Sequence, residues 1–315
     1  MTAQPNPPPL FSTDQRASGL SSDGAPTRPF YWLVRRELWD NPSIYVAPLI
    51  AAGVVLLGSV ITAFHLPQLR RAALLLEPTR RRSAIELHYD VAAMMVMFTA
   101  FIVAVFYCLD ALYGERRDKS ILFWKSLPVS DRLTVLSKAF VPFVILPLLT
   151  FVVIEVTQLI ILLMDTVALA PSGLGSTTWA NLALGRLSVL LFYYLMTNAL
   201  WQAPVYGWLL LVGGYARRAT FLWAVLPWLA LCAIEKIVLG TGYFASMLNH
   251  RITGGFEEAF VVAHYPKDAH VPVVDRLTAL APLKFLSSPG LWIGLVIAAA
   301  FIIAAIQLRR SRGPL

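Results

Sequence analysis

Apolar residues dominate six stretches of this chain, and each stretch is long enough to cross a membrane. A helix of about 20 apolar residues covers a hydrocarbon core about 30 Å thick, and backbone polar groups must be paired inside lipid. The pattern therefore predicts an all-α polytopic membrane protein with six transmembrane helices. Their expected boundaries are about 43–64, 91–112, 138–163, 185–212, 221–239 and 289–307.

Two of these stretches contain residues that disturb a helix. Pro142 and Pro147 lie in the third, and proline lacks the N–H that an interior helical residue donates, so a kink is expected there. The fourth is longer than one span requires and carries Gln202 and Pro204 near its middle. We expect its helix either to break or to begin outside the membrane.

The polar segments between and before the spans differ in character. Residues 1–27 are rich in Pro, Ser, Gly and Asp, which predicts a disordered cytoplasmic tail. Residues 28–41 mix aromatic with basic side chains, a composition typical of an amphipathic interfacial helix. Residues 240–288 form the largest connection and predict two short re-entrant or capping helices, separated at Gly254 and Gly255, over the outer mouth of a cavity.

Charge is scarce and mostly basic. The chain is 57% hydrophobic and 14% charged, with a net charge of +8 and a mean hydropathy of +0.65. No basic soluble segment interleaved with aromatic residues is present, so nucleic-acid binding is not expected. In a membrane protein, Lys and Arg concentrate in cytoplasmic loops instead.

The distribution of basic residues predicts the orientation. Six spans, within a membrane domain of residues 42–308, put both termini on one side. That side carries 15 Lys and Arg residues and the opposite side nine. The bias predicts that the tail, the loop 113–137 and the basic C-terminus 309–315 are cytoplasmic. The first outer connection is an exception, because it carries five arginines: Arg70, Arg71, Arg80, Arg81 and Arg82.

Few residue patterns favour chemistry within this chain. The segment from Gly114 to Ser120 lacks the glycine before Lys119 that a phosphate-binding loop requires, and no strand precedes it. Neither GxSxG nor HExxH occurs. The five histidines lie on the predicted outer side without tight metal-ligand spacing, and Cys108 and Cys232 lie inside apolar spans. We expect no catalytic residue, no metal site and no cofactor in this chain.

Three acidic residues lie inside the predicted spans, where ionisable groups are costly and often functional. Glu155 lies deepest, with Gln158 on the same helix face. The pair predicts either a hydrogen bond to a neighbouring helix or a polar group on a translocation path. Asp110 lies near the cytoplasmic end and is interpreted as an interfacial polar residue. Glu235 is next to Lys236 near the outer end, where we expect a local ion pair or a side chain that extends towards the membrane surface.

Small residues recur four apart at the start of the sixth span, at Gly290, Gly294 and Ala298. This spacing allows close approach of two helices or of two subunits.

The loop 113–137 has the densest charge in the chain, and it surrounds a short apolar cluster that contains Phe123 and Trp124. The pattern predicts a short helix over about 118–126, after which Ser130 caps the helix that begins at Asp131. One interpretation is an ordinary basic cytoplasmic loop with aromatics in the membrane interface. The other is a docking element for a partner protein.

Three short motifs in this loop favour the second interpretation. They are Tyr113-Gly-Glu-Arg-Arg-Asp-Lys-Ser120, Trp124-Lys-Ser-Leu-Pro-Val-Ser-Asp131 and Ser137-Lys138. Together they resemble the connection between the second and third spans of ABC type-2 exporter permeases. The resemblance implies a permease subunit, a second permease copy and two separate ATP-binding subunits that hold ATP and Mg. It also implies that a short helix docks on the ATPase, through Glu115, Arg116, Arg117, Lys119, Phe123 and Trp124.

With this resemblance, the sequence predicts the membrane subunit of an ATP-driven exporter in a bacterial inner membrane, with no catalysis of its own. Two other functions stay open at this level. One is a sensor or regulatory assembly that uses the same machinery without bulk export. The other is a membrane enzyme acting on lipids, with Glu155 or the outer histidines as catalytic groups. The residues do not indicate the substrate.

Overall fold

The computed structural model describes residues 29–119, 130–261 and 279–311, and these residues form helices without a named strand. One isolated antiparallel bridge pairs Phe260 with Leu280. The helices, with one π-helical and one 3-10 segment, are α1 Pro29–Asp40, α2 Ser43–Ala63, α3 Leu66–Leu74, α4 Pro78–Arg117, α6 Asp131–Phe140, η2 Val141–Ile145, α7 Leu146–Leu169, η3 Ala170–Ser172, α8 Gly175–Asn181, α9 Leu184–Trp201, α10 Ala203–Tyr215, α11 Thr220–Val238, α12 Tyr243–Thr253, α13 Gly255–Ala259, α14 Pro282–Ser287 and α15 Pro289–Ser311.

Within the described ranges, five helical stretches are long and apolar enough to cross a membrane. The protein is therefore an all-α membrane protein. The five stretches are Ser43–Ala63, Arg80–Arg117, Asp131–Ser172, Thr220–Val238 and Pro289–Ser311. Five of the six predicted spans match these stretches, and none of the five extends more than one residue beyond its stretch.

The fourth predicted span is divided between two shorter helices, α9 and α10. α9 ends at Trp201, and α10 begins at Ala203 with Pro204 in its first turn, where the missing proline N–H costs nothing. α9, with 18 residues, has about the minimum length of a span, and α10, with 13 residues, is too short to span alone.

The third predicted span also departs from a regular helix. Residues 141–145, which include Pro142, form the π-helical segment η2, and Pro147 lies in the first turn of α7. Prolines free carbonyl groups four residues earlier in the chain, and a π-turn re-pairs the backbone locally. Before this irregularity, the predicted cap is confirmed: the Ser130 side chain accepts a hydrogen bond from the Leu133 N–H, at 3.3 Å.

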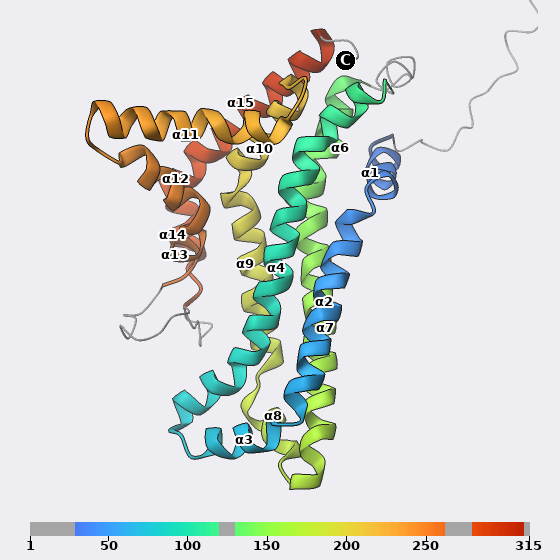
Figure 1. The fold of residues 1–315 in the computed structure, drawn as a ribbon, viewed down its shortest axis with the longest axis vertical. Coiled ribbons are helices and arrows are strands. Elements are labelled where there is room, and N and C mark those ends of the chain that lie inside the picture. The colour runs from blue at the N-terminus through green and yellow to red at the C-terminus, as the bar shows by residue number, and fades with distance from the viewer. Residues whose placement is uncertain (1–28, 120–129, 262–278, 312–315) are drawn as a thin grey trace, which may run out of the picture.

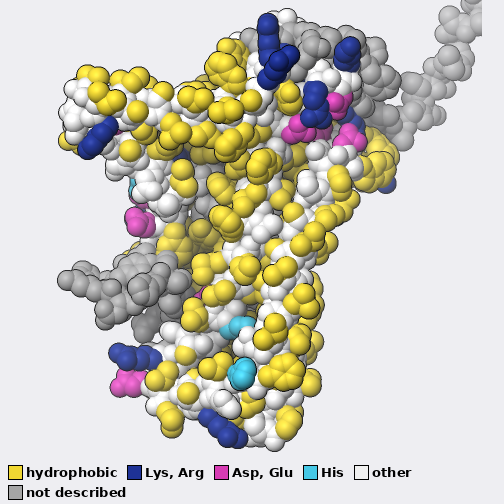
Figure 2. Space-filling view, in the orientation of Figure 1, with side chains coloured by type: hydrophobic (Ala, Val, Ile, Leu, Met, Phe, Trp, Pro, Cys, Tyr) yellow, Lys and Arg dark blue, Asp and Glu magenta, His cyan; other side chains and the backbone are white. Residues whose placement is uncertain are grey.

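The long helices run side by side in an elongated bundle (Figure 1). α4 has 40 residues, which corresponds to about 60 Å at 1.5 Å per residue, roughly twice the thickness of a hydrocarbon core. One end of the bundle gathers α1, the end of α4, the start of α6 and the end of α15. We call this the charged end, because Figure 2 shows acidic and basic side chains concentrated there. At the far end lie α3 and α8.

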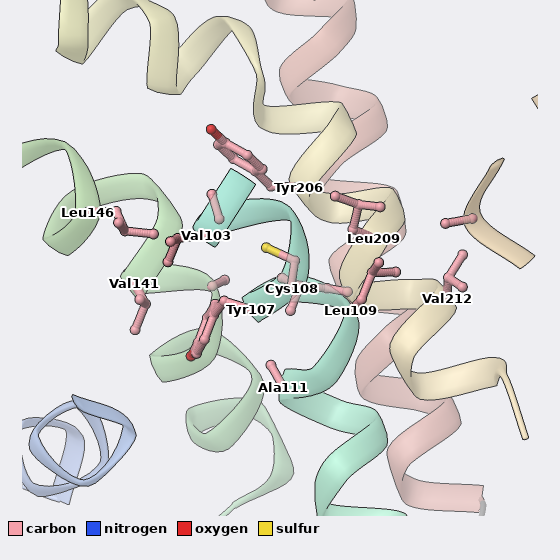
Figure 3. Close-up of a cluster of buried hydrophobic side chains, with 14 of the residues drawn as sticks. Val103, Tyr107, Cys108, Leu109, Ala111, Val141, Leu146, Tyr206, Leu209 and Val212 are labelled. Carbon is pink, nitrogen blue, oxygen red and sulfur yellow. The ribbon is translucent and has the colours of Figure 1, made fainter. Parts of the chain in front are cut away.

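A buried apolar cluster lies between α4 and its neighbours towards the charged end (Figure 3). Cys108 and Leu109 of α4 lie near Leu209 of α10, while Val141 and Leu146 pack from the η2–α7 side. This core fixes α4 and α10 against each other, and both helices lead directly into the charged end.

α11 departs from the direction of the bundle. It lies across the bundle rather than along it, and together with α12 it forms an arm that projects to one side (Figure 1). Of its residues, only Ala224 is buried. The helix covers the predicted fifth span almost residue for residue, but its orientation is one that the sequence did not suggest.

The arm returns to the bundle through short helices. α12 and α13 are separated at Gly254, as expected from the sequence, and α14 precedes the final long helix. Glu235, expected to pair with Lys236, instead accepts hydrogen bonds at the start of α12, from the backbone N–H groups of Tyr243 at 2.6 Å and Phe244 at 2.8 Å. A carboxylate at a helix N-terminus satisfies donors that have no partner within the helix.

Several sequence-based predictions concern residues outside the described ranges. They are the tail 1–27, most of the short helix 118–126, and the proposed docking residues Phe123 and Trp124.

Candidate functional site

Four buried charged side chains from four helices meet at the charged end. Lys138 Nζ of α6 lies 2.8 Å from Glu37 Oε1 of α1 and 3.2 Å from Glu115 Oε1 of α4. The second oxygen of Glu115 pairs with Nη1 of Arg309, in α15. Each side chain is at most 6% exposed. Charges taken out of water need such partners, because an unpaired buried charge is strongly destabilising.

Two further groups extend this cluster. The Tyr107 hydroxyl donates to Glu37 Oε2 at 3.1 Å, and Arg309 Nε donates to Asp131 Oδ1 at 2.9 Å. We refer to Glu37, Tyr107, Glu115, Asp131, Lys138 and Arg309 as the charge network. It joins α1, α4, α6 and α15 through side chains up to 194 positions apart.

Arg309 has a specific geometric role within the charge network. One guanidinium contacts Glu115, in the last turns of α4, and also Asp131, the first residue of α6. These two carboxylates flank the connection 118–130 on either side. A fixed, planar fork of donors suits this double pairing better than a single lysine ammonium would. The two ends of the connection are thereby clamped to the C-terminal helix.

Arg116 fixes a fifth helix to the same region. Its Nη1 donates to the carbonyl oxygens of Gly214 at 2.8 Å and Ala216 at 3.2 Å, at the end of α10. These carbonyls have no helical partner of their own, because the helix ends there. The last turn of α4 is therefore tied to the end of α10.

The six residues predicted to dock on a partner thus fall into three groups. Glu115 and Arg116 are buried and form contacts within the chain. Arg117 and Lys119 are exposed, and Arg117 pairs with Asp118 at 2.9 Å. Phe123 and Trp124 lie outside the described residues. Lys119 has a φ of 58°, a left-handed conformation that ends α4.

The three candidate polar residues of the predicted spans, Glu155, Gln158 and Asp110, each contact a different partner. Glu155 Oε2 accepts a hydrogen bond from Ser188 Oγ of α9 at 2.7 Å, and Gln158 Nε2 lies 3.4 Å from the carbonyl oxygen of Tyr89 in α4. Both contacts join neighbouring helices. Asp110 is 54% exposed and lies 4.0 Å from Arg117.

A second polar cluster, at the far end, was not among the predicted sites. Asp165 of α7 accepts a hydrogen bond from the Tyr89 hydroxyl at 2.9 Å and lies 3.7 Å from Arg70 Nη2. Arg70 also donates to Thr178 of α8 at 3.0 Å. Burial lowers the pKa of Arg70, while Asp165 and Tyr89 act in the opposite direction. The arginine-rich outer connection was the one signal for this cluster, because Arg70 belongs to it.

Two cavities lie along the bundle. The first, of 410 Å³, lies among α4, α7, α9 and α10 and is mostly apolar. Two polar atoms of its lining residues, Thr150 Oγ1 and Gln202 Oε1, are buried without a hydrogen-bond partner among the described residues. The second, of 930 Å³, lies between the α11–α12 arm and the bundle. Neither Glu155 nor Gln158 lines either cavity.

The described part of the chain contains no group of three or more His, Cys, Asp or Glu that could hold a metal ion. No protein-family model, curated protein or solved structure matches the chain.

Proposed function

We propose that this protein is the membrane subunit of an ABC-type exporter and that movement of separate ATP-binding subunits enters it through the connection 113–137. The observation that carries this proposal is the double pairing of Arg309 with Glu115 and Asp131. A connection whose two flanks are clamped to a third helix transmits displacement to that helix. A slack loop would absorb the displacement instead.

The buried pairs define the route that such a displacement takes. From Glu115 it passes to Lys138 and α1, from Arg309 to α15, and from Arg116 to the end of α10. Packed, fully paired contacts move as one body, because separating them exposes unpaired charge to a low-dielectric interior. The docking contact itself is assigned to the exposed residues Arg117 and Lys119, and to Phe123 and Trp124 of the adjoining segment. Glu115 and Arg116 then position this surface.

The proposal includes six membrane crossings, with both termini cytoplasmic. α1 and the end of α15 are linked through the charge network, so they lie on one side of any membrane. An even number of crossings follows. α9 and α10 together supply the fourth crossing, and α11 supplies the fifth.

The cavity of 410 Å³ is the proposed part of the translocation path in this chain. It combines apolar walls with the unpaired Thr150 and Gln202 oxygens, and such walls with a few polar groups are typical of small-molecule sites. A second permease copy completes the path in the proposed assembly. Its transport cycle needs substrate affinity to differ between two states.

The test is purification of the tagged protein in mild detergent from the membranes of its own source. We expect ATP-binding subunits to co-purify, identified by mass spectrometry, together with ATPase activity. Replacing Arg117→Glu together with Trp124→Ala should reduce both by tenfold or more, because it removes an exposed charge and an aromatic contact. The buried Arg116 is left intact, so that folding is not the quantity under test.

The matched control is Arg82→Glu, which reverses an exposed arginine elsewhere in the chain. It should leave both the co-purified subunits and the ATPase activity unchanged. A wild-type preparation without an ATP-binding subunit would overturn the proposed partnership. A double variant that retains full ATPase activity would overturn the assignment of the docking surface.

A further inference from the structure

Arg251 occupies an unusual position at the wall of the 930 Å³ cavity, between the arm and the bundle. Its guanidinium lies 4.4 Å from the ring centroid of Trp201, and Nη1 donates to the Gly290 carbonyl at 2.9 Å. Gly294 leaves room for it, because a Cβ atom at that position would overlap Nη2. Trp201 and the start of α15 therefore hold the side chain in one place.

The guanidinium has unused hydrogen-bonding capacity. Its Nε and Nη2 atoms are buried and have no hydrogen-bond partner among the described residues. Burial lowers the pKa of Arg251 to about 10, so the side chain still carries its charge at neutral pH. A buried charged donor without a partner costs free energy that an anion in the cavity would recover.

The other charged residues around this cavity do not neutralise Arg251. Glu258 is the one carboxylate among the described lining residues, and it lies 3.8 Å from His250 Nε2. Lys284 adds a second positive charge, and its Nζ donates to the Glu257 carbonyl at 2.6 Å. The lining therefore has an excess of positive charge near one end of an otherwise apolar space.

The remaining walls are apolar and aromatic. Trp208 of α10, Trp228 of α11 and Phe301 of α15 line the space, and Trp208 packs against both of the others, with ring centroids 5.4 and 5.5 Å apart. Two further lining residues, Leu229 and Ile293, are more than 60% exposed. In a membrane protein, exposed apolar residues of this kind face lipid. The cavity thus connects a partly buried cation, whose Nε and Nη2 atoms are buried, with the surface where acyl chains lie.

We propose that this cavity binds one anionic phospholipid, whose phosphate contacts the Nε and Nη2 groups of Arg251 and whose acyl chains lie along the Trp208, Trp228 and Phe301 walls. An arginine fork matches phosphate oxygens in geometry as well as charge. The volume, 930 Å³, is near the upper end of the range of about 300–1,000 Å³ that small-molecule sites occupy. The phosphate and the start of the chains fill the cavity, and the chain ends extend into the bilayer.

Binding is tested on the purified full-length chain in a non-ionic detergent, by titration with phosphatidylglycerol. Tryptophan fluorescence reports binding, because three tryptophans line the cavity, and native mass spectrometry counts the bound lipids. We expect one tightly bound phosphatidylglycerol and at least tenfold weaker binding of phosphatidylcholine, whose ammonium group opposes Arg251. Inorganic phosphate alone should not compete at millimolar concentration. Competition by phosphate would instead identify a soluble anion and overturn the lipid.

Two variants separate loss of the site from loss of the fold. Arg251→Gln should weaken phosphatidylglycerol binding at least tenfold and abolish the preference over phosphatidylcholine. Ile297→Trp, on the cavity wall, should block binding by filling the space. Its matched control is Val296→Trp, at the neighbouring exposed position outside the lining, which should bind as wild type. Equal binding by all three variants would overturn the proposal.

This proposal is independent of an ATP-binding partner, because the chain alone is titrated. Lipid binding without co-purifying ATPase subunits would support the cavity and not the exporter. The converse result would support the exporter and remove the lipid site.

Discussion

At the scale of single residues, each buried charged side chain in the described part of the chain meets an opposite charge or a backbone carbonyl. Lys138 lies between Glu37 and Glu115, and Arg116 reaches two carbonyl oxygens at a helix end. The exposed pair Arg36–Asp40, 2.9 Å apart, lies near the network but has one partner that is 54% exposed. We therefore expect the buried pairs of Lys138 to contribute much more to the free energy of unfolding than the exposed pair Arg36–Asp40 does.

Replacing Lys138→Met should therefore destabilise the fold by about 3–5 kcal/mol, because it leaves two buried carboxylates without their shared cation. Replacing Asp40→Asn, which breaks the exposed pair, should cost less than about 1 kcal/mol. Unfolding of the detergent-solubilised protein in increasing SDS, followed by tryptophan fluorescence, measures both. Adding Glu37→Gln to Lys138→Met should recover part of the loss, since it removes the charge of Glu37, whereas Glu115 keeps its pairing with Arg309. If Lys138→Met and Asp40→Asn reduced the stability of the protein equally, the larger stabilising effect assigned to the buried ion pairs would be wrong.

At the scale of helices, residues at the helix ends and at close helix crossings determine where each helix begins, where it ends and how it packs. Ser130 caps α6, Glu235 caps α12, and the prolines place the break between α9 and α10 and the π-helical segment before α7. Among the glycines of α10, Gly213 lies closest to a neighbouring backbone. A Cβ atom there would lie 2.7 Å from the Leu109 carbonyl oxygen in α4. Because this oxygen belongs to the backbone of a packed helix, it cannot move aside as a flexible side chain can.

Gly213→Ala should consequently separate α10 from α4 and destabilise the protein by about 1–3 kcal/mol. Its neighbour gives a matched comparison. A Cβ atom at Gly214 would lie 3.6 Å from Leu112 Cδ1, an ordinary contact, so Gly214→Ala should be neutral or stabilising by up to about 1 kcal/mol, as alanine favours helix. The same SDS unfolding assay measures both changes. A larger loss from Gly214→Ala than from Gly213→Ala would contradict the close crossing seen between α4 and α10.

At the scale of the whole molecule, the network also restricts how the chain can cross a membrane. Ion pairs that link α1, α4, α6 and α15 cannot form across a bilayer, and this supports the proposed placement of the two ends of the described chain on one side. The number of membrane crossings then depends on whether α11 crosses the membrane, because this helix is exposed and lies across the bundle.

Labelling with a membrane-impermeant maleimide in intact cells tests this arrangement. The parent variant is Cys232→Ser, which retains only the fully buried Cys108 and should not react. Cysteine at the exposed positions Arg82 and Asn249 should be labelled from outside, and cysteine at Arg310 only after the cells are permeabilised. If Asn249→Cys behaved like Arg310→Cys, then α11 would not cross the membrane. If Arg310→Cys reacted in intact cells, the predicted cytoplasmic side would be wrong.

The sequence by itself determined the class of the protein and most of its helices. Long apolar stretches need helices because lipid offers no partner for backbone polar groups, and that requirement is local. The same is true of the Ser130 cap, the Gly254 break and the proline-induced irregularities, each of which depends on residues within one or two turns. The docking prediction also came from local motifs, and it therefore named Glu115 and Arg116 without indicating that they are buried.

Tertiary structure alone decided which polar groups meet. Glu37 finds Lys138 at a distance of 101 positions, Arg309 finds Glu115 at 194, and Asp165 finds Tyr89 at 76, and no periodicity encodes such pairings. Tertiary packing also decided the position of Arg251 beside Trp201 and Gly290, and the orientation of α11 across the bundle. The physical reason is that helix formation is satisfied within each segment. The partner of a buried charge is fixed only when several segments pack together and exclude water.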